Sequence, residues 1–419
     1  MKITLVSTSS KTGGAAIACR RLLNALTKSG IETKLLVRDF ESGQSIVSTT
    51  KSQFKKWLNF YRFAYERFMF FIREKSKSVR FLFSIANTGE DISKHDLIKN
   101  SDIVHLHWIN QGFLSLKSLK KIFKLNKPVV WTLHDMWAFT GGCHHSGSCE
   151  KYKTSCRNCP FLRFPWRNDL SHRLWKHKIK INKKADLTIV TCSEWLKKSA
   201  IESSILAGKK IISIPNPINT NIFVPTDKLS ARKKFDLQEN KKYLMFGAVN
   251  VNNYFKGFTY FKEALKLLVE QEPDMKNKIE LVILGRSTPE VLKELPFKCT
   301  IIKKIDDEDT MCQLYNAVDV YVTPSLQENL PNTIMESFAC GTPVVAFNIG
   351  GIPEMVDHKQ NGYLAEYLSS NDLANGIRWT LFEANTEMLS KNARNKVLEN
   401  YSEEIVANKY IGLYHELLK

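Results

Sequence analysis

Short apolar runs alternate with longer amphipathic stretches along the chain. Residues 3–6 form an apolar run that predicts a strand, and residues 15–28 carry apolar side chains at helical spacing up to a closing glycine, Gly30. Residues 32–37 predict the next strand, so the chain begins as a β-α-β unit. Later apolar runs predict strands over residues 102–108, 128–133, 185–191, 211–214, 243–248, 280–284, 300–303, 320–323 and 344–347. The pattern indicates an α/β fold.

This alternation is interrupted once and then resumes. Pro215-Asn216-Pro217 can continue neither a helix nor a strand, and 419 residues are many for a single hydrophobic core. We therefore expect two domains, at residues 1–215 and 218–400. In the second domain we expect a tight turn at Gly285-Arg286. Helices are predicted over residues 258–269, 310–317, 332–339 and 392–419.

The stretch at residues 54–83 combines aromatic and basic side chains. Its aromatic residues are Trp57, Phe60, Tyr61, Phe63, Tyr65, Phe68, Phe70 and Phe71. Its basic residues are Lys55, Lys56, Arg62, Arg67, Arg73, Lys75, Lys77 and Arg80. A basic aromatic helix of this kind can lie in the interface of an anionic membrane. The alternative is a core helix with a solvated basic face.

Composition limits the class of protein. Hydrophobic residues make up 43% and charged residues 25% of the chain, which is typical of a globular enzyme. The formal charge of +19 points to an anionic partner. A recognised nucleic-acid module is not found, so we expect no nucleic acid. Without a signal-peptide pattern or a long apolar run, we expect a cytoplasmic protein with reduced cysteines, peripheral on the inner face of the membrane.

Residues 324–354 hold the main candidate site. Glu328 follows a predicted strand, Pro331 lies in the first turn of a helix, and Glu336 lies on that helix. A helix N-terminus attracts a diphosphate, and a carboxylate can accept hydrogen bonds from both hydroxyls of a ribose. Gly350-Gly351 follows the next strand and lets backbone approach a ligand. Two solvated surface carboxylates are the alternative interpretation.

These residues resemble the donor-site signature of the retaining, family 4 type glycosyltransferases. Glu328 and Glu336 form E-x7-E, which A-C-G-T-P-V-V-A and G-G-x-P-E follow. The resemblance covers nearly the whole chain and implies a GT-B fold, with two Rossmann-like domains that face each other across a cleft. It also implies that the first domain holds the acceptor, that the second holds the nucleotide-sugar donor, and that a last helix at residues 401–419 packs back on the first.

The resemblance assigns roles to residues of the second domain. It implies that Glu336 holds ribose, that Glu328 holds hexose hydroxyls, and that Lys256 stabilises the leaving diphosphate. It places the backbone of Asn329, Leu330, Gly350 and Gly351 against the donor. The family often carries arginine five residues before the lysine. Here that position is Val251, and Arg286 is a candidate replacement.

In the first domain, the T-x-H-D segment after the predicted strand 128–133 delivers His134. The resemblance implies that His134 contacts the donor hexose or supports the reacting centre, although it could be a buried structural histidine. His105 and His107 end the strand before it, where a histidine is more often structural. The Gly13-Gly14 loop does not match the dinucleotide fingerprint, and the resemblance places it near the acceptor.

Four cysteines cluster as C-x5-C-x6-C-x2-C at Cys143, Cys149, Cys156 and Cys159. Four thiolates fit a structural zinc ion, and His144 or His145 could replace one ligand. Reduced thiols in an ordered loop are the alternative, and disulfides are disfavoured in the cytoplasm. The segment H-D-M-W-A-F-T-G-G-C before the cluster resembles that of bacterial surface-glycan enzymes.

We therefore expect a hexosyltransferase-type enzyme of surface polysaccharide or lipopolysaccharide synthesis. It would move a sugar, with retention, from a nucleotide diphosphate to a hydroxyl of a glycan or lipid-linked glycan. The sequence shows no D-x-D motif placed to bridge a metal, so we expect no catalytic metal. The alternatives are an epimerase or inverting transferase of the same fold, or a non-catalytic basic protein that binds membranes or nucleic acid.

Overall fold

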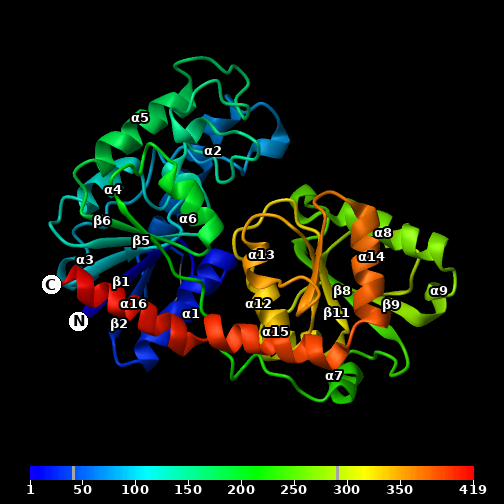
Figure 1. Cartoon of the computed structure of the whole chain (residues 1–419). Helices are drawn as coiled ribbons and strands as arrows, with labels where there is room; N and C mark the ends of the chain where they lie inside the picture. The colour runs from blue at the N-terminus through cyan, green and yellow to red at the C-terminus, as the bar shows by residue number, and fades with distance from the viewer. Residues whose placement is uncertain (40–42, 289–291) are drawn as a thin grey trace. The chain divides into compact units, whose positions relative to one another are not determined.

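The computed structural model describes residues 1–39, 43–288 and 292–419, and these form two compact units. Unit 1 comprises Met1–Pro217 and Val406–Lys419, and unit 2 comprises Ile218–Ile405. Each unit has a parallel sheet with helices on both faces (Figure 1). The α/β class and the Rossmann-like units expected from the sequence are confirmed.

Unit 1 is organised around a seven-stranded sheet of order β3-β2-β1-β4-β5-β6-β7. All six neighbouring pairs described in this sheet are parallel. Its strands are β1 (Lys2–Ser7), β2 (Glu32–Val37), β3 (Ile46–Ser48), β4 (Ile103–Leu106), β5 (Val129–Leu133), β6 (Leu187–Thr191) and β7 (Lys210–Ser213). Among the strands of unit 1 only β3 was not predicted, because it is three residues long and half-buried and lacks a strong apolar signal; in unit 2, β13 (Gly362–Ala365) was not predicted either.

The strands of unit 1 supply two cores because alternate side chains point to opposite faces of the sheet. In β1, Leu5 belongs to one apolar cluster and Val6 to the other. In β4, Ile103 and Val104 divide in the same way. The helices that follow in the chain are α1 (Gly14–Lys28), α2 (Gln53–Phe71), α3 (Asp96–Asn100), α4 (Leu116–Ile122), α5 (Leu170–Asn182) and α6 (Glu194–Ile201).

The end of the chain forms two helices, α15 (Thr386–Asn400) and α16 (Glu403–Leu417), instead of the single helix predicted over residues 392–419. Ile218 causes the break, because its backbone forms hydrogen bonds with the residues between α15 and α16. Ile218 N donates to Tyr401 O at 2.8 Å, and Glu403 N donates to Ile218 O at 3.1 Å. From Val406 on, α16 belongs to unit 1, and its residues Tyr410 and Tyr414 are buried in the same core as β1.

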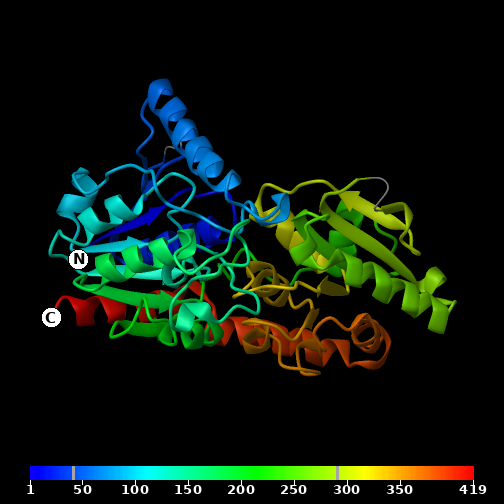
Figure 2. The ribbon, with the colours of Figure 1, turned by 90° about the horizontal axis from the view of Figure 1, so that it is seen from above.

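Helix α2 ends at Phe71 and does not extend to residue 83, which corrects the sequence-based interpretation of residues 54–83 as one helix. The chain that follows α2 forms backbone hydrogen bonds with the cysteine-containing loop at residues 140–169. Lys75 N donates to Phe161 O, and Ser84 N donates to Gly142 O, both at 2.9 Å. In Figure 2, α2 extends away from the rest of unit 1.

Unit 2 contains a six-stranded parallel sheet of order β10-β9-β8-β11-β12-β13. Its strands are β8 (Lys242–Asn250), β9 (Ile279–Arg286), β10 (Cys299–Ile302), β11 (Val320–Thr323), β12 (Val344–Phe347) and β13 (Gly362–Ala365). The tight turn expected at Gly285-Arg286 is wrong, because both residues lie in β9 and Arg286 pairs with Asn250 after a register shift. A side chain at Gly285 would meet the Ala248 carbonyl, which explains glycine there.

The helices of unit 2 cover both faces of its sheet. They are α7 (Lys228–Lys234), α8 (Phe258–Gln271), α9 (Met275–Lys278), α11 (Glu308–Ala317), α12 (Asn332–Ala339), α13 (Ile352–Met355), α14 (Ser370–Arg378) and α15. Helix α12 and strands β11 and β12 have the predicted limits, because long apolar runs meet sharp turn signals there. Tyr315 and Ala317 of α11 are fully buried, as expected.

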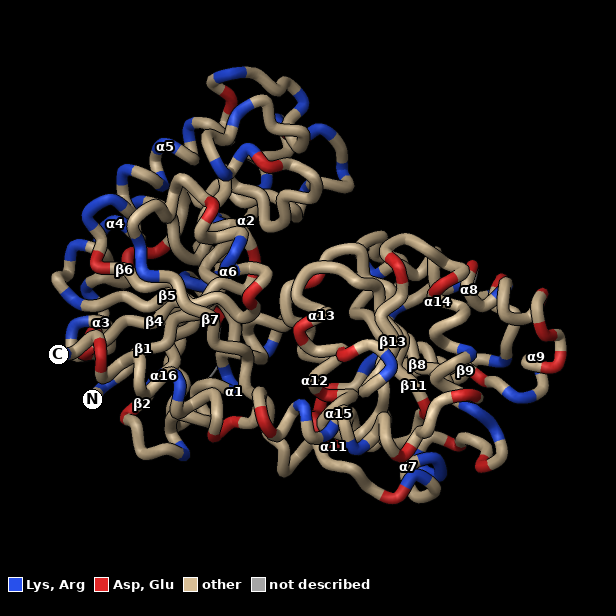
Figure 3. The backbone as a smooth tube through the Cα atoms, viewed as in Figure 1, with Lys and Arg blue, Asp and Glu red and all other residues tan. Residues whose placement is uncertain are grey.

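Within the ranges that the structure describes, no helix combines the length and apolarity needed to cross a bilayer. Basic residues are spread over both units (Figure 3). Helices α4 and α5 contain lysine, arginine and histidine but no acidic residue. The formal charge of +19 is therefore distributed over the surface and does not come from one terminal tail.

Candidate active site

The carboxyl edge of the unit 2 sheet gathers most of the sequence-predicted donor-site residues. Strand β8 lies beside β11, and β11 lies beside β12. The loops that follow these three strands carry Lys256, Glu328 and Gly350-Gly351, respectively. Ligands of open parallel sheets bind at this edge, because the loops and helix N-termini converge there.

Lys256 and Glu328 form an ion pair between two of these loops. The Glu328 carboxylate raises the pKa of the Lys256 ammonium above its ordinary value, although burial opposes that shift. The Glu328 side chain is 15% exposed and that of Lys256 is 38% exposed. The Lys256 ammonium is therefore partly exposed, and the largely buried Glu328 carboxylate holds it in position.

Two glycines allow these loops to pack closely. Gly257 follows Lys256 with a φ of 70°, and a Cβ there would lie 1.8 Å from the Pro324 carbonyl oxygen. A Cβ at Gly350, whose φ is 62°, would lie 1.9 Å from the Glu328 carbonyl oxygen. Because only glycine tolerates both the positive φ and the contact, the sequence fixes the relative positions of the Lys256 and Glu328 loops.

Glu336 lies on α12 and is only 7% exposed. The Tyr315 hydroxyl donates a hydrogen bond to its carboxylate at 3.2 Å. The Tyr315 ring packs against Tyr321 of β11, with 5.8 Å between the ring centroids. Tyr321 was not singled out from the sequence; its place in the apolar strand gave only a core signal. The solvated-surface alternative for Glu336 is wrong, because this side chain is buried.

Asn329 and Leu330 are buried between Glu328 and the start of α12, where Pro331 occupies the N-cap position instead of the first turn. No side-chain capping bond is described for this helix start, where Ile334 N donates to Pro331 O at 3.1 Å.

Arg286 lies at the exposed end of β9. Val251, at the position where the family often carries arginine, is fully buried, and its N–H donates to Arg286 O at 2.9 Å. The backbone of Arg286 is therefore hydrogen-bonded to the loop that contains Val251. Arg286 remains the candidate for the cation that the family carries at the position of Val251. The structure brings Lys256 and Glu328 into contact but leaves Arg286 on the neighbouring strand β9.

In unit 1, His134 follows β5 and contacts His107, which follows β4. His134 Nε2 lies 3.1 Å from His107 Nδ1, and its Nδ1 lies 3.6 Å from Cys192 Sγ. Burial lowers the pKa of His134 to about 4, so its imidazole is neutral near pH 7. His107 was interpreted as structural from its strand-end position, and only the fold shows its contact with His134.

His105 is sealed inside unit 1. Its Nδ1 lies 2.7 Å from the Tyr414 hydroxyl, and its Nε2 lies 2.7 Å from Thr132 Oγ1. The Tyr410 hydroxyl lies 2.9 Å from the same Thr132 oxygen. Burial lowers the pKa of His105 to about 3. Helix α16 therefore supports the strands that carry the histidines, a role that spacing alone did not reveal.

Asp135, next to His134, is a hydrogen-bond hub. It accepts from Trp108 Nε1 at 3.0 Å and from Trp137 N at 2.8 Å, and its Oδ2 lies 2.7 Å from His144 Nδ1. Burial opposes ionisation of Asp135, but His144 and the backbone donor outweigh it and lower the pKa of the carboxyl to about 2. Asp135 is thus an ionised group that orients the loop after β5.

The Gly13-Gly14 loop lies at the carboxyl end of β1, next to β4. Gly13 precedes α1 with a φ of 94°, and both glycines are exposed. Thr8 joins this loop to the one after β4, because its N donates to Trp108 O at 2.8 Å. Gly13, Gly14 and His134 therefore lie on loops at the same edge of the unit 1 sheet.

The four clustered cysteines lie in the loop between η2 (Trp137–Phe139) and α5. They have free thiols, and burial raises the pKa of Cys156 and of Cys159 to about 12. As the side chains stand in the described ranges, no three His, Cys, Asp or Glu residues form a group that could hold a metal ion.

Each of the two units matches the model of a known protein family. The family model described as Glycosyltransferase Family 4 matches residues 12–222, and the model described as Glycosyl transferases group 1 matches residues 240–382. These two ranges correspond to unit 1 and unit 2 and include the residues of both sheet edges, from Gly13 to Gly351.

Among curated relatives, an uncharacterized glycosyltransferase of Methanocaldococcus jannaschii is 27% identical over 54% of this chain and 59% of its own length. The chain thus spans less than two thirds of that relative. A putative colanic acid biosynthesis glycosyl transferase, WcaC of Escherichia coli, is 24% identical over 75% of this chain and 76% of its own length.

Solved structures share the whole fold. A sucrose-phosphate synthase from Thermosynechococcus elongatus superposes with a TM-score of 0.67 at 19% identity, covering 100% of this chain and 99% of its own. Anabaena HepE, solved in complex with UDP and glucose, gives a TM-score of 0.63 at 16% identity, with coverage of 99% and 100%. At such low identity these matches establish the fold alone.

Proposed function

Since the chain belongs to glycosyltransferase family 4, we propose that it transfers a sugar from a nucleoside-diphosphate donor to a hydroxyl of a glycan or lipid-linked glycan. We assign the reaction to surface polysaccharide assembly and to retention at the anomeric carbon. The observation that carries the proposal is the arrangement at the unit 2 sheet edge. There a fixed Lys256–Glu328 ion pair lies at the same edge as the helix that carries the buried Glu336.

In this proposal the donor binds along the loops after β8, β11 and β12. Glu336 accepts hydrogen bonds from the ribose hydroxyls, and Tyr315 holds its carboxylate in place. The backbone of Gly350 and Gly351 approaches the donor, because neither residue has a side chain. Asn329 and Leu330 contribute backbone contacts ahead of α12, whose N-terminus favours the diphosphate.

Lys256 is the proposed catalytic cation. As the bond between the anomeric carbon and the diphosphate oxygen breaks, negative charge grows on that oxygen, and the ammonium offsets it. Glu328 holds the lysine and binds hexose hydroxyls. Arg286 is the candidate second cation. We propose that this arrangement acts without a divalent cation. His134 is the proposed sugar-contacting residue of unit 1, where a neutral imidazole can both donate and accept hydrogen bonds.

Binding should be measured first, by thermal shift with UDP, GDP, ADP, CMP and their sugars. A ligand at a hundred times its Kd stabilises the folded state by about 2.7 kcal/mol. We expect one base to give a clearly larger shift than the others, which would identify the nucleotide of the donor. Glu336→Gln should weaken nucleotide binding about 10-fold or more, since it removes a charged acceptor of hydrogen bonds. Lys256→Ala should lower kcat about 100-fold while changing the Kd less.

Matched controls are Glu399→Gln on the exposed face of α15 and Lys266→Ala on the exposed face of α8, which should leave binding and turnover unchanged. Unchanged nucleotide affinity in Glu336→Gln would contradict the ribose role. The anomeric configuration of the product, measured by NMR, distinguishes retention from inversion. Release of an epimer without an acceptor would favour an epimerase instead.

We also propose that the exposed face of α2 lies in the interface of an anionic membrane, where a lipid-linked acceptor would be found. A stripe of aromatic side chains supports this: Phe54 is 77% exposed, Trp57 is 69% exposed and Phe68 is 59% exposed. Phe164 and Trp166, also exposed, extend the surface, because Arg163 N donates to Arg73 O just beyond the helix. Aromatic residues with nearby cations are typical of interfacial helices.

Fewer basic side chains are free to meet a membrane at this surface than the sequence suggested. Arg67 is buried and donates to Arg80 O at 2.7 Å, and Arg80 itself pairs with Glu74. Lys55 pairs with Glu90. These residues hold the fold together, whereas Lys56, Lys75 and Lys77 are exposed and are the cations that can meet lipid headgroups.

Membrane binding should be tested by co-sedimentation with vesicles of phosphatidylcholine, with and without phosphatidylglycerol. We expect binding that needs the anionic lipid and weakens with salt. Lys56→Glu with Lys75→Glu should weaken it at least about 30-fold, since each surface cation contributes about 1 kcal/mol. Trp57→Ser with Phe68→Ser should also weaken it, whereas Leu398→Ser, at an exposed apolar position of α15, should not. Equal binding to both lipid mixtures would contradict the proposal.

A further inference from the structure

The loop from residue 140 to residue 169 has little regular structure but a buried interior. Its only described helical turn is η3 (Lys151–Lys153). Cys156 and Cys159 are each 8% exposed, and Leu162 is 4% exposed. A loop of this length normally needs its own packing or a crosslink to hold one conformation. The loop has few large apolar side chains, so the cysteines make up much of its buried interior.

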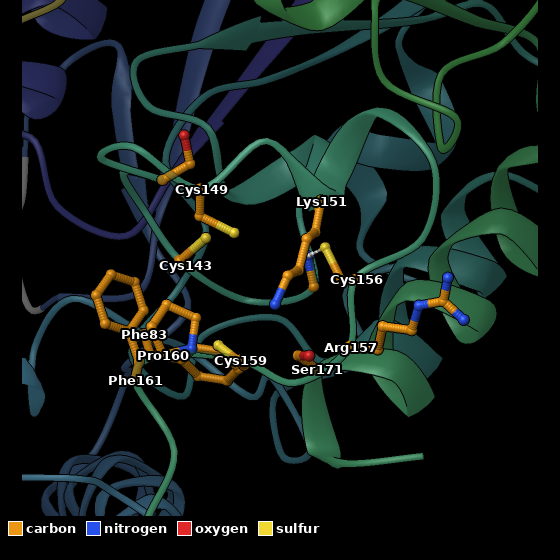
Figure 4. Close-up of a pocket in the computed structure, with 12 residues that line it drawn as sticks. Phe83, Cys143, Cys149, Lys151, Cys156, Arg157, Cys159, Pro160, Phe161 and Ser171 are labelled. Atoms are coloured by element: carbon orange, nitrogen blue, oxygen red, sulfur yellow. Dashed lines mark hydrogen bonds between the residues drawn. The ribbon is translucent and has the colours of Figure 1, made fainter. Parts of the chain in front are cut away.

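The four cysteines come from separate points of the loop and line one cavity, together with Gly141 and Ser171 (Figure 4). The cavity has a volume of about 20 Å³. Roughly 10–15 Å³ is enough for one water molecule. The cavity therefore has room for about one water molecule or one metal ion.

Hydrogen bonds fix the backbone at three of the four cysteines. Thr140 Oγ1 donates to Cys143 O at 2.6 Å, and Cys149 N donates to Ser146 O at 3.0 Å. Asp169, the N-cap of α5, accepts from Cys159 N at 2.8 Å. These bonds hold the backbone of Cys143, Cys149 and Cys159 in place, while each thiol can still rotate about its Cα–Cβ bond.

One of these bonds reaches a sulfur. Gly141 N donates to Cys156 Sγ at 3.1 Å, the contact drawn as a dashed line in Figure 4. A backbone N–H that points at sulfur stabilises the thiolate, the form that binds metals. A Cβ at Gly141 would lie 2.7 Å from Cys156 Cβ, so glycine is required for this approach.

From the four cysteines that line this one cavity, we propose that Cys143, Cys149, Cys156 and Cys159 bind one structural zinc ion. Four thiolates match the tetrahedral preference of Zn²⁺ and leave no open position for substrate. As placed, the side chains do not form a ligand group. A change of rotamer moves a cysteine sulfur without moving the backbone, and the proposal requires such a change at these cysteines.

The ion would stabilise two neighbouring parts of unit 1. The loop pairs with the chain that follows α2, where Ser84 N donates to Gly142 O and His144 N donates to Leu82 O, both at 2.9 Å. His144, the residue after Cys143, also contacts Asp135. Zinc would therefore stabilise both the chain that follows α2 and the loop after β5, although it would take no part in sugar transfer.

Metal analysis of the whole chain, purified under reducing conditions, should find about one zinc per chain. Replacement by Co²⁺ should give the absorption of tetrahedral cobalt with thiolate ligands, a readout independent of activity. Cys156→Ser and Cys159→Ser should lose most of the bound metal, whereas Cys299→Ser, in β10 of unit 2, should retain it. Chelation should expose four additional thiols to a thiol reagent and lower the Tm.

Two results would overturn the proposal. One is a reduced wild-type chain that takes up neither zinc nor cobalt. The other is a count below nine free thiols in the unfolded, unreduced chain, with the four loop cysteines missing, which would show disulfides instead. The cobalt spectrum of the wild-type protein decides the matter even where a serine variant fails to fold.

Discussion

At the scale of single residues, burial decides which form of each titratable group is present. His105, His107 and His134 lie in a row of rings, with centroids 4.5 Å apart for the first pair and 5.4 Å for the second. Burial lowers the pKa of all three, and nearby imidazoles add to the effect for His105 and His107. The row thus consists of neutral imidazoles near pH 7, each of which can both donate and accept a hydrogen bond.

This row predicts how stability depends on pH. In the unfolded chain each histidine titrates near pH 6.5, whereas the folded pKa is about 4 for His134 and about 3 for His105. Between these values the unfolded chain binds protons that the folded chain does not. Stability should therefore be highest above pH 6.5 and fall toward pH 4, by about 1.4 kcal/mol per pH unit for each histidine.

Urea unfolding at a series of pH values measures this slope. His107→Gln should reduce it, because the unfolded state then has one fewer buried-site histidine to protonate. His415→Gln, on the exposed side of α16, is the matched control and should leave the slope unchanged. If His107→Gln and wild type share the same slope, the buried row does not govern acid sensitivity.

At the scale of elements, the loops after the strands of unit 2 determine the site, and glycines determine those loops. Leu326 N donates to Phe255 O at 2.9 Å, which joins the loop after β8 to the loop after β11. Gly257 makes that approach possible, because its Cα faces the Pro324 carbonyl. The Lys256–Glu328 pair therefore depends on backbone packing as much as on charge.

Gly257→Ala should destabilise the protein and also impair nucleotide binding. The added Cβ would meet the Pro324 oxygen at 1.8 Å, and the residue would have to keep a φ of 70°. Gly30→Ala is the matched control, since its φ is 81° and nothing lies within 4 Å of its Cβ. Gly30→Ala should cost about 1 kcal/mol of strain, and Gly257→Ala about 2 kcal/mol more. Equal losses, measured by urea unfolding, would contradict the packing argument.

At the scale of the whole molecule, the last helix makes unit 1 depend on both ends of the chain. Val406, Tyr410 and Tyr414 join the core that β1 and β4 supply. The two tyrosines also take part in the hydrogen bonds around Thr132 and His105. Unit 1 is therefore complete only when the chain has returned to it after unit 2.

Truncation after Ile405 should abolish the cooperative unfolding of unit 1. Each large buried side chain removed costs about 2–5 kcal/mol, and several together approach the whole stability of a domain. Calorimetry should show the loss of one transition, while the transition of unit 2 should still shift with nucleotide. Removal of Leu418 and Lys419 alone, both exposed, is the control and should change neither transition. An intact unit 1 transition after truncation would contradict the argument.

Much of the second unit was predictable from local signals. The limits of β11, α12 and β12 follow from apolar runs that end at Pro324, Gly341 and Asn348, and the Glu328 and Glu336 signature lies between them. Strand β3 was not predictable because it is short and half-buried, and the break between α15 and α16 was not predictable because its cause is a partner distant in sequence. For the break that partner is Ile218.

The sequence by itself determined the alternation of strands and helices, the residues at the strand ends and the glycines that the loops require, since these depend on near neighbours along the chain. Only the tertiary structure decided which of those residues meet. It pairs Lys256 with Glu328, gives His134 the neighbour His107, and pairs Lys55 of α2 with Glu90. Such contacts join residues far apart in sequence, so spacing cannot specify them.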